Sequence, residues 1–243
     1  MKLSITALLL ASLSTTTFAG GVHWAYKGEH GAKHWAQLSS EFGTCSTGVN
    51  QSPIDITSSI EAQLPTLRIS YSDSKAEVVN NGHTIQANLS GKNTFANDAG
   101  QFDLLQFHFH SPSENTIDGK SFPMEVHFVH ADAQGRLAVI GVMFTEGASN
   151  AELERVWDVM PTQSNTKNAL VGTLNSSDLL PTSQDYFRFN GSLTTPPCSE
   201  GVRWFVMKNP IEASKAQIKK FRKVLGGDTN RPIQPINARV VLK

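Results

Sequence analysis

The 243-residue chain lacks most features that mark the special classes of protein. Its 21 basic and 21 acidic residues cancel, and no basic stripe runs along it, so nucleic acid is not an expected partner. It has no internal repeat, no low-complexity linker and no block of like charge that would mark a domain boundary. Beyond the N-terminus, no apolar run is long enough to span a membrane. With 39% hydrophobic and 17% charged residues, the composition is typical of a globular protein.

The N-terminus carries a separate signal. Lys2 precedes the apolar run ITALLLASL, which is too short to span a bilayer, and the small and polar residues STTTFAG follow. This order is typical of a signal peptide, with cleavage expected after Ala19. The alternative interpretation is a buried first helix. We expect residues 1–19 to be removed and residues 20–243 to form a mature periplasmic or secreted protein.

Cysteine is scarce, because Cys45 and Cys198 are the only two. A small, even number in an exported protein suggests a structural disulfide, and two independent buried thiols are the alternative. A bond between them would close a loop of roughly 150 residues and stabilise the fold by roughly 5 kcal/mol in the chain-entropy model. A disulfide between residues so far apart would also favour one cooperative domain.

Short strand-like runs dominate the remaining sequence, and turn residues such as Asn81-Gly82 and Asp118-Gly119 separate them. The predicted strands cover residues 67–72, 83–89, 102–110, 124–131, 137–144 and 202–208. Two helices are predicted, one after the N-cap residue Asn150 and one after Ser214, which has Gln217 at capping-box spacing. Strands outnumber helices and do not alternate with them, which disfavours a doubly wound parallel sheet. We predict a mainly β, α+β fold: a single domain on a large, mostly antiparallel twisted sheet with peripheral helices.

Four of the eight histidines lie in residues 104–130, LLQFHFHSPSENTIDGKSFPMEVHFVH. Residues two apart share one face of a strand, so His108 and His110 project the same way. On the second strand His127 points to one face and His130 to the other. If the two strands are neighbours in one sheet, the first three imidazoles converge and the fourth does not.

Three neutral imidazoles can bind zinc and leave a fourth position open to water, which is typical of a catalytic zinc site. Gln106 and Glu125 each lie two residues before one of these histidines, on the same face. Each can accept a hydrogen bond from the second ring nitrogen of a metal ligand. A solvated strand surface is the alternative, but it fits poorly with the surrounding Phe, Leu, Met and Val residues.

With these residues the sequence resembles the α-class carbonic anhydrases, in particular exported bacterial members. The resemblance covers nearly the whole mature chain and rests on seven motifs in order, HWAYKGEHGAKHW, NQSPIDI, NNGH, QFHFHSPSEN, EVHFVH, GSLTTPPCSEGVRW and NRPIQP. It implies a zinc lyase that reversibly hydrates carbon dioxide to bicarbonate and a proton. The reaction implied is attack by a zinc-bound hydroxide, followed by export of the proton through a histidine.

The resemblance also implies roles for individual residues. It assigns Zn²⁺ to His108, His110 and His127, with Gln106 as acceptor for the first and Glu125 for the third. His110 should donate to the backbone carbonyl of Thr229, where the family usually has Asn. Cys45 and Cys198 match a disulfide of extracellular and bacterial members, which should hold the loop that follows residue 193.

In that loop, Thr194 resembles the family's gatekeeper threonine, whose hydroxyl donates to Glu114 and accepts from the zinc-bound hydroxide. Thr195 is similar to the residue on the bicarbonate side of the site. Read alone, the Thr-Thr-Pro-Pro segment would be a simple turn. The apolar wall beside carbon dioxide should consist of Val129, Val139, Leu193, Val202 and Trp204. Each of these five, read singly, is an ordinary core residue.

His83, in NNGH, matches the histidine that carries protons at the mouth of the family's cavity. Without the resemblance it would be a strand-edge histidine after a turn. Tyr26, Asn81 and Gln86 match the polar residues that hold the connecting waters. The sequence departs from the family pattern in two places. Many members have Asn where Gln86 stands, and HWAY replaces the commoner His-Trp-Gly-Tyr.

Two other functions remain open on the same fold. An exported zinc-carrying or adhesion module without hydration activity would have no use for Thr194, Glu114 and His83 together. A zinc esterase would use the same nucleophile, and its larger substrates would need a wider cavity. The sequence does not fix the oligomeric state, and a dimer is compatible with it.

Overall fold

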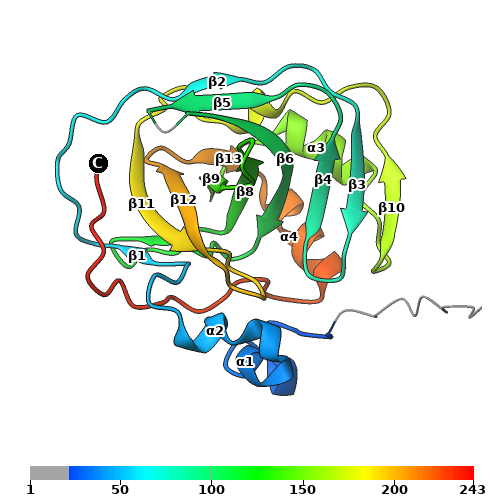
Figure 1. Cartoon of the computed structure of the whole chain (residues 1–243). Coiled ribbons are helices and arrows are strands. Elements are labelled where there is room, and N and C mark those ends of the chain that lie inside the picture. Colours follow the sequence, from blue (N-terminus) through cyan, green and yellow to red (C-terminus); the bar gives the residue numbers. More distant parts are fainter. Residues whose placement is uncertain (1–21, 99) are drawn as a thin grey trace, which may run out of the picture.

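A large twisted sheet lies at the centre of the computed structural model, which describes residues 22–98 and 100–243 (Figure 1). Helices lie around this sheet, which confirms the predicted mainly β architecture. The expected signal peptide, residues 1–19, lies outside the described residues. None of the helices among the described residues has the length and apolar character needed to cross a membrane.

Eleven strands form the main sheet, and a second sheet has two. The strands of the main sheet are β2 (Arg68–Ser70), β3 (Ala76–Asn80), β4 (Ile85–Leu89), β5 (Thr94–Asn97), β6 (Gly100–His110), β8 (Met124–Ala131), β9 (Leu137–Glu146), β10 (Thr166–Ala169), β11 (Tyr186–Ser192), β12 (Glu200–Met207) and β13 (Ile211–Ala213). Their main path runs β10-β3-β4-β6-β8-β9-β12-β11. Most neighbours are antiparallel, but β12 and β13 both pair with β9 in parallel. The sheet is therefore mixed rather than purely antiparallel.

The second sheet and several strands were not predicted from the sequence. The pair β1 (Asp55–Ile56) and β7 (Thr116–Ile117) is too short to show a hydrophobic period. Strands β3, β5, β10, β11 and β13 were also missed. For β10 the reason is clear, because all four of its residues are exposed and so carry no apolar alternation.

The two predicted helices are present with the expected caps. Helix α3 (Ala151–Asp158) begins after Asn150, whose side chain accepts from the backbone N–H of Leu153. Helix α4 (Lys215–Leu225) has a capping box between Ser214 and Gln217 and ends at Gly226, which has a left-handed φ of 73°. The shorter helices are α1 (Trp35–Leu38), α2 (Thr44–Thr47), η1 (Gly28–His30), η2 (Ser40–Phe42) and η3 (Ser176–Leu179).

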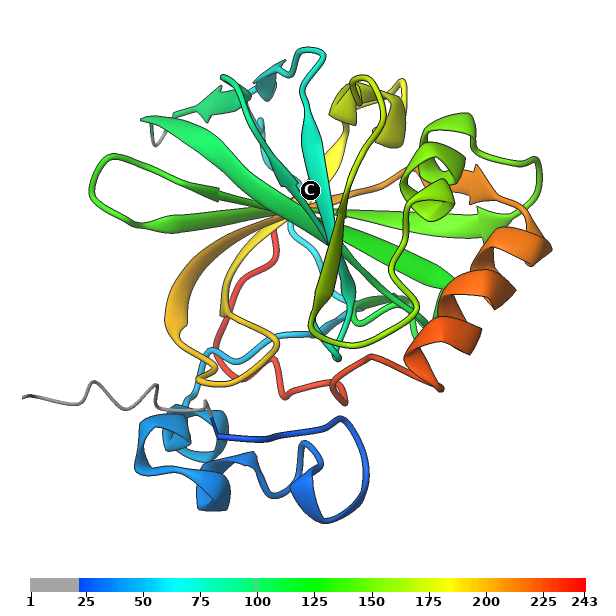
Figure 2. The same cartoon turned by 90° about the vertical axis from the view of Figure 1, so that its right-hand side faces the viewer.

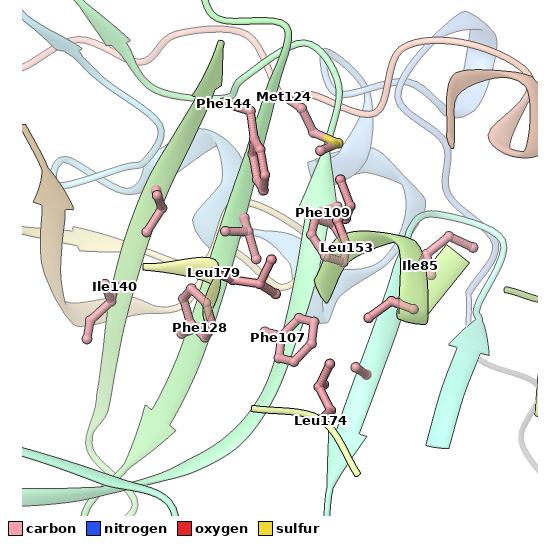
Figure 3. Packing of buried hydrophobic residues seen from close by; sticks show 14 of the residues in the cluster. Ile85, Phe107, Phe109, Met124, Phe128, Ile140, Phe144, Leu153, Leu174 and Leu179 are labelled. Atoms are coloured by element: carbon pink, nitrogen blue, oxygen red, sulfur yellow. The ribbon is translucent and has the colours of Figure 1, made fainter. Parts of the chain in front are cut away.

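Alternate residues of the central strands enter two different apolar clusters. On one face, Phe107, Phe109 and Phe128 pack together with Leu153 of α3 (Figure 3). Residues of α4 belong to the same cluster. On the other face, Val129 and Val139 belong to a second cluster. Every residue of β8 except the last is buried, because both faces of this strand are covered. Any polar side chain of β8 on the second face must therefore find its partners inside the protein.

Two segments far apart in the sequence lie together at one end of the molecule. The segment after α4 runs between the sheet and the N-terminal part of the chain that carries α1 and α2, and both views show this arrangement (Figures 1 and 2). Hydrogen bonds from Arg231 to Cys45, Gln51 and Ser52 join the two segments. Residues from opposite ends of the chain thus meet below the second face of the sheet.

Candidate metal centre and active site

Strands β6 and β8 bring three histidines together on the second face. The two strands are antiparallel neighbours, and His108 lies directly opposite His127 in their register. With His110, these residues offer ring nitrogens that all lie within 4.8 Å of one another. As the strand period predicts, His130 lies on the other face, where its Nε2 is 2.6 Å from the hydroxyl of Tyr71.

A different oxygen faces the second nitrogen of each imidazole. Nδ1 of His108 is 2.9 Å from Oε1 of Gln106. Nδ1 of His110 is 2.6 Å from the backbone carbonyl of Thr229. Nε2 of His127 is 3.0 Å from Oε1 of Glu125, although the two atoms form no hydrogen bond. The nitrogens left for a shared ligand are therefore Nε2 of His108 and His110 and Nδ1 of His127.

Glu125 is itself held in place by backbone and side-chain donors. Its Oε2 accepts from the backbone N–H groups of Glu114 (2.8 Å) and Asn115 (2.9 Å). Its Oε1 accepts from Nδ2 of Asn115 at 2.9 Å. Three donors on a buried carboxylate fix its orientation, so that Oε1 stays beside His127.

Burial keeps the three imidazoles in the form that binds metal. It lowers the pKa of His110 to about 4, and it lowers the pKa of His108 and His127 well below their ordinary value, with neighbouring imidazoles adding to the effect. Each ring is then neutral near pH 7, and the neutral imidazole is the metal ligand. Nε2 of His110 and Oε2 of Glu114 are buried, 3.4 Å apart, and have no hydrogen-bond partner among the described residues. Three neutral imidazoles beside such unpartnered atoms fit a tetrahedral zinc ion with one open position.

Glu114 connects this centre to the threonine loop. The backbone N–H of Arg231 donates to Oε1 of Glu114 at 2.7 Å. Burial raises the pKa of Glu114 to about 8, although the Arg231 N–H and the nearby Thr194 side chain oppose the shift. The loop is closed by a bond from the backbone N–H of Cys198 to the carbonyl of Thr195. The disulfide between Cys45 and Cys198 anchors its end.

The five apolar residues expected beside the histidines gather in one place. Val129, Val139, Val202 and Trp204 are buried in the second apolar cluster, and Leu193 packs against it. The ring of Trp204 stands edge-on to that of His127, with 4.9 Å between their centroids. An apolar wall therefore adjoins the polar centre.

His83 lies at the rim of the site, just before β4, where the strand begins two residues later than predicted. Its ring stacks on Trp24, with centroids 3.7 Å apart and planes 8° from parallel. Both rings line a cavity of about 290 Å³ that also includes Tyr26 and Thr229. Thr229 is the residue whose carbonyl faces His110, so this cavity lies next to the histidine centre.

The three polar residues expected near His83 have distinct surroundings. Oδ1 of Asn81 accepts from the backbone N–H groups of His83 and Thr84, so this oxygen stabilises the turn. Nε2 of Gln86 donates to Oδ1 of Asn88 at 2.7 Å. The hydroxyl of Tyr26 is buried without a hydrogen-bond partner among the described residues.

Comparison with known proteins identifies the family. The family model for eukaryotic-type carbonic anhydrase matches residues 30–243. The chain is also 47% identical over 241 residues to a carbonic anhydrase of Pectobacterium carotovorum, covering 99% of this chain and 98% of that protein. The chain belongs to the eukaryotic-type, or α, carbonic anhydrase family. The enzyme therefore interconverts carbon dioxide and bicarbonate.

Solved structures show the same fold. An α-carbonic anhydrase of Thermovibrio ammonificans, in complex with the inhibitor sulfanilamide, is 51% identical and superposes with a TM-score of 0.90. The match covers 92% of this enzyme and all of that chain. A structure of dioscorin complexed with ascorbate is 29% identical with a TM-score of 0.85, and it covers 90% of this enzyme and 97% of that chain.

Sequence reasoning missed several residues that organise the site of this carbonic anhydrase. Trp24 stacks on His83, Asn115 holds Glu125, and Gln51 and Arg231 bind one another near Glu114. All four lie within the quoted motifs, but a motif shows no contact between residues far apart in sequence. Arginine is rarely buried, so nothing in the sequence singled out Arg231.

Proposed function

We propose that His108, His110 and His127 hold the zinc ion at which this enzyme hydrates carbon dioxide. The observation that carries the proposal is the set of three buried, neutral imidazoles whose remaining nitrogens lie together beside Glu114. When bound, zinc would act as a Lewis acid that lowers the pKa of a water molecule, so that this water loses a proton near neutral pH and hydroxide is available to attack carbon dioxide, an effect for which carbonic anhydrases are the standard example.

Thr194 and Glu114 orient the nucleophile in this proposal. In this role the Thr194 hydroxyl would donate its proton to the Glu114 carboxylate, and its oxygen would accept a hydrogen bond from the attacking group. That group's lone pair then points toward the substrate. Carbon dioxide is small and apolar, so the wall of Val129, Val139 and their neighbours can hold it without binding it tightly. Thr195 would line the bicarbonate side.

Each turnover also releases a proton, and His83 is the proposed carrier. It is half-buried at the rim cavity, so its ring can exchange protons with the interior and with solvent. Burial and the nearby His23 lower its pKa from the ordinary value, which favours rapid release of the proton to solvent. Tyr26, Asn81 and Gln86 are the proposed polar contacts for the waters between His83 and the metal centre.

Stopped-flow measurement of carbon dioxide hydration, with and without a zinc chelator, tests this function. We expect fast hydration that disappears with chelation and returns with added zinc. A zinc-carrying or adhesion module would bind the metal without hydrating carbon dioxide. A dedicated zinc esterase would hydrolyse an aryl ester with a higher kcat/KM than it shows for carbon dioxide.

We further propose that residues 1–19 are a signal peptide and that the enzyme works in the periplasm. The order of a charged residue, an apolar run and small residues at the N-terminus supports export. The Cys45–Cys198 disulfide also fits an exported protein, because cytosolic thiols are kept reduced. Mass spectrometry of enzyme isolated from the periplasmic fraction should give a chain that begins at Gly20. A chain that retains residues 1–19 in the cytosol would contradict the proposal.

A further inference from the structure

Arg231 is one of the largest buried side chains in the protein, with 2% of its surface exposed. A buried guanidinium destabilises a fold unless its donors find acceptors. Here Nη1 donates to Oε1 of Gln51 (2.9 Å) and to the carbonyl of Ser52 (2.8 Å), and Nη2 donates to the carbonyl of Cys45 (3.0 Å). Burial lowers its pKa to about 10, so it stays charged at neutral pH.

The same residue reaches the catalytic centre through its backbone. Its N–H donates to Oε1 of Glu114 at 2.7 Å, and its charge attracts the Glu114 carboxylate. The guanidinium contacts fix the segment that presents this N–H. Any shift of that segment would move or release the Glu114 oxygen, and the carboxylate could no longer orient Thr194.

The guanidinium partners lead to the disulfide. Cys45 accepts directly from Arg231 through its backbone carbonyl. Gln51, whose Oε1 accepts from Arg231, donates through Nε2 to the carbonyl of Cys198 at 3.0 Å. Both half-cystines are therefore tied to one buried arginine. Arg231 therefore links the Cys45–Cys198 disulfide, at the end of the loop that carries Thr194, to the Glu114 carboxylate.

We propose that Arg231 is a positioning residue that ties the Cys45–Cys198 disulfide to Glu114 and so keeps Thr194 oriented for attack on carbon dioxide. The proposal rests on the roles given above to Glu114 and Thr194. It predicts a defect in hydration itself, because the hydrogen bonds of Arg231 lead to Glu114 and to both half-cystines. The guanidinium also lies over the ring of Trp35, 5.5 Å from its centroid, and Trp35 contacts the Trp24 ring that stacks on His83. A loss of proton export through that contact would lower kcat alone, so the test measures kcat/KM.

The test compares Arg231→Gln with the matched control Arg239→Gln. Arg239 lies in the same C-terminal segment and also donates to three backbone carbonyls, those of Ile236, Asn190 and Pro235, but it has no hydrogen bond to Glu114. We expect Arg231→Gln to retain one zinc per chain and to lose roughly ten- to hundredfold in kcat/KM for hydration, since a small misplacement of catalytic groups has effects of this size. Arg239→Gln should keep the wild-type kcat/KM.

Further measurements separate positioning from a general loss of structure. Imidazole buffer should not restore kcat/KM in Arg231→Gln, because kcat/KM for hydration does not depend on proton export. Arg231→Lys, which keeps the charge but cannot reach all three acceptors, should lose several-fold and serves as the test if the Gln variant does not fold. In the Cys45→Ser/Cys198→Ser background, Arg231→Gln should cost much less in kcat/KM than in the wild type, since the two changes act on one link.

Equal kcat/KM in the Arg231→Gln and Arg239→Gln variants would overturn the inference, as would full rescue by imidazole or strictly additive effects with the cysteine variants. These outcomes are distinguishable from failure of the proposed function. If the proposed function were wrong, the wild-type enzyme, loaded with zinc, would itself fail to hydrate carbon dioxide.

Discussion

Loss of the Cys45–Cys198 disulfide should destabilise the enzyme strongly. The bond joins residues 153 positions apart, for which the chain-entropy model gives about 5 kcal/mol at 25 °C. A typical domain has about 5–15 kcal/mol of total stability, so this one bond accounts for a large share. The figure is an upper bound, because a real unfolded chain is more compact than the model assumes.

Urea unfolding of the wild type and of Cys45→Ser/Cys198→Ser, both saturated with zinc, measures this effect. Zinc must be held constant because a ligand of the folded state adds its own stabilisation. We expect a lower midpoint in the variant and a larger dependence on urea, since an open chain exposes more surface on unfolding. Activity should fall as well under conditions where the variant is folded, because Cys198 ends the loop that carries Thr194.

Two results would refute this reasoning. One is a pair of alkylatable thiols in enzyme freshly isolated under non-reducing conditions. The other is a difference in unfolding free energy below about 1 kcal/mol, which would mean that the link does not restrict the unfolded chain as the model requires.

Three further predictions concern individual histidines. His127→Ala should lose zinc on dialysis, whereas His130→Ala should keep one zinc per chain, and metal analysis of both would expose a wrong strand register if they lost zinc equally. His83→Ala should lower kcat but leave kcat/KM for hydration nearly unchanged, with imidazole buffer restoring much of kcat; a parallel loss of both constants would exclude the shuttle role. The zinc-free protein should lose stability as the pH falls from about 6.5, the unfolded value, toward the folded pKa values of about 4 for His110 and about 3 for His130, because the unfolded chain then binds more protons. Urea unfolding at several pH values across this range should show a shallower decline in the free energy of unfolding for His130→Gln than for the wild type. An equal decline in both proteins would contradict the lowered folded pKa of His130.

The face that each histidine occupies followed from strand period, whereas the pairing of β6 with β8 was assumed. In β6 and β8 the apolar residues Phe107, Phe109 and Phe128 alternate with histidines, and this alternation fixes which side chains share a face. Cap residues likewise predicted the starts of α3 and α4, because a cap is a local contact within a few residues. Local physics was sufficient wherever the deciding contacts lie close together in sequence.

Contacts between distant segments could not be predicted in this way. Thr229 reaches His110 across 119 residues and Arg231 reaches Cys45 across 186, and no local pattern marks either pair. The carbonyl contact of Thr229 was expected only through the family resemblance. The parallel pairing of β9 with β12 also depends on how the chain returns to the sheet, which the period of each strand leaves open.

Zinc titration of the metal-free enzyme tests the central claim most directly. Hydration of carbon dioxide should rise linearly with added zinc and level off at one equivalent per chain, and His127→Ala should stay inactive over the same range of zinc concentrations. Hydration by the metal-free enzyme, or full activity in His127→Ala at one equivalent, would contradict a catalytic zinc held by His108, His110 and His127.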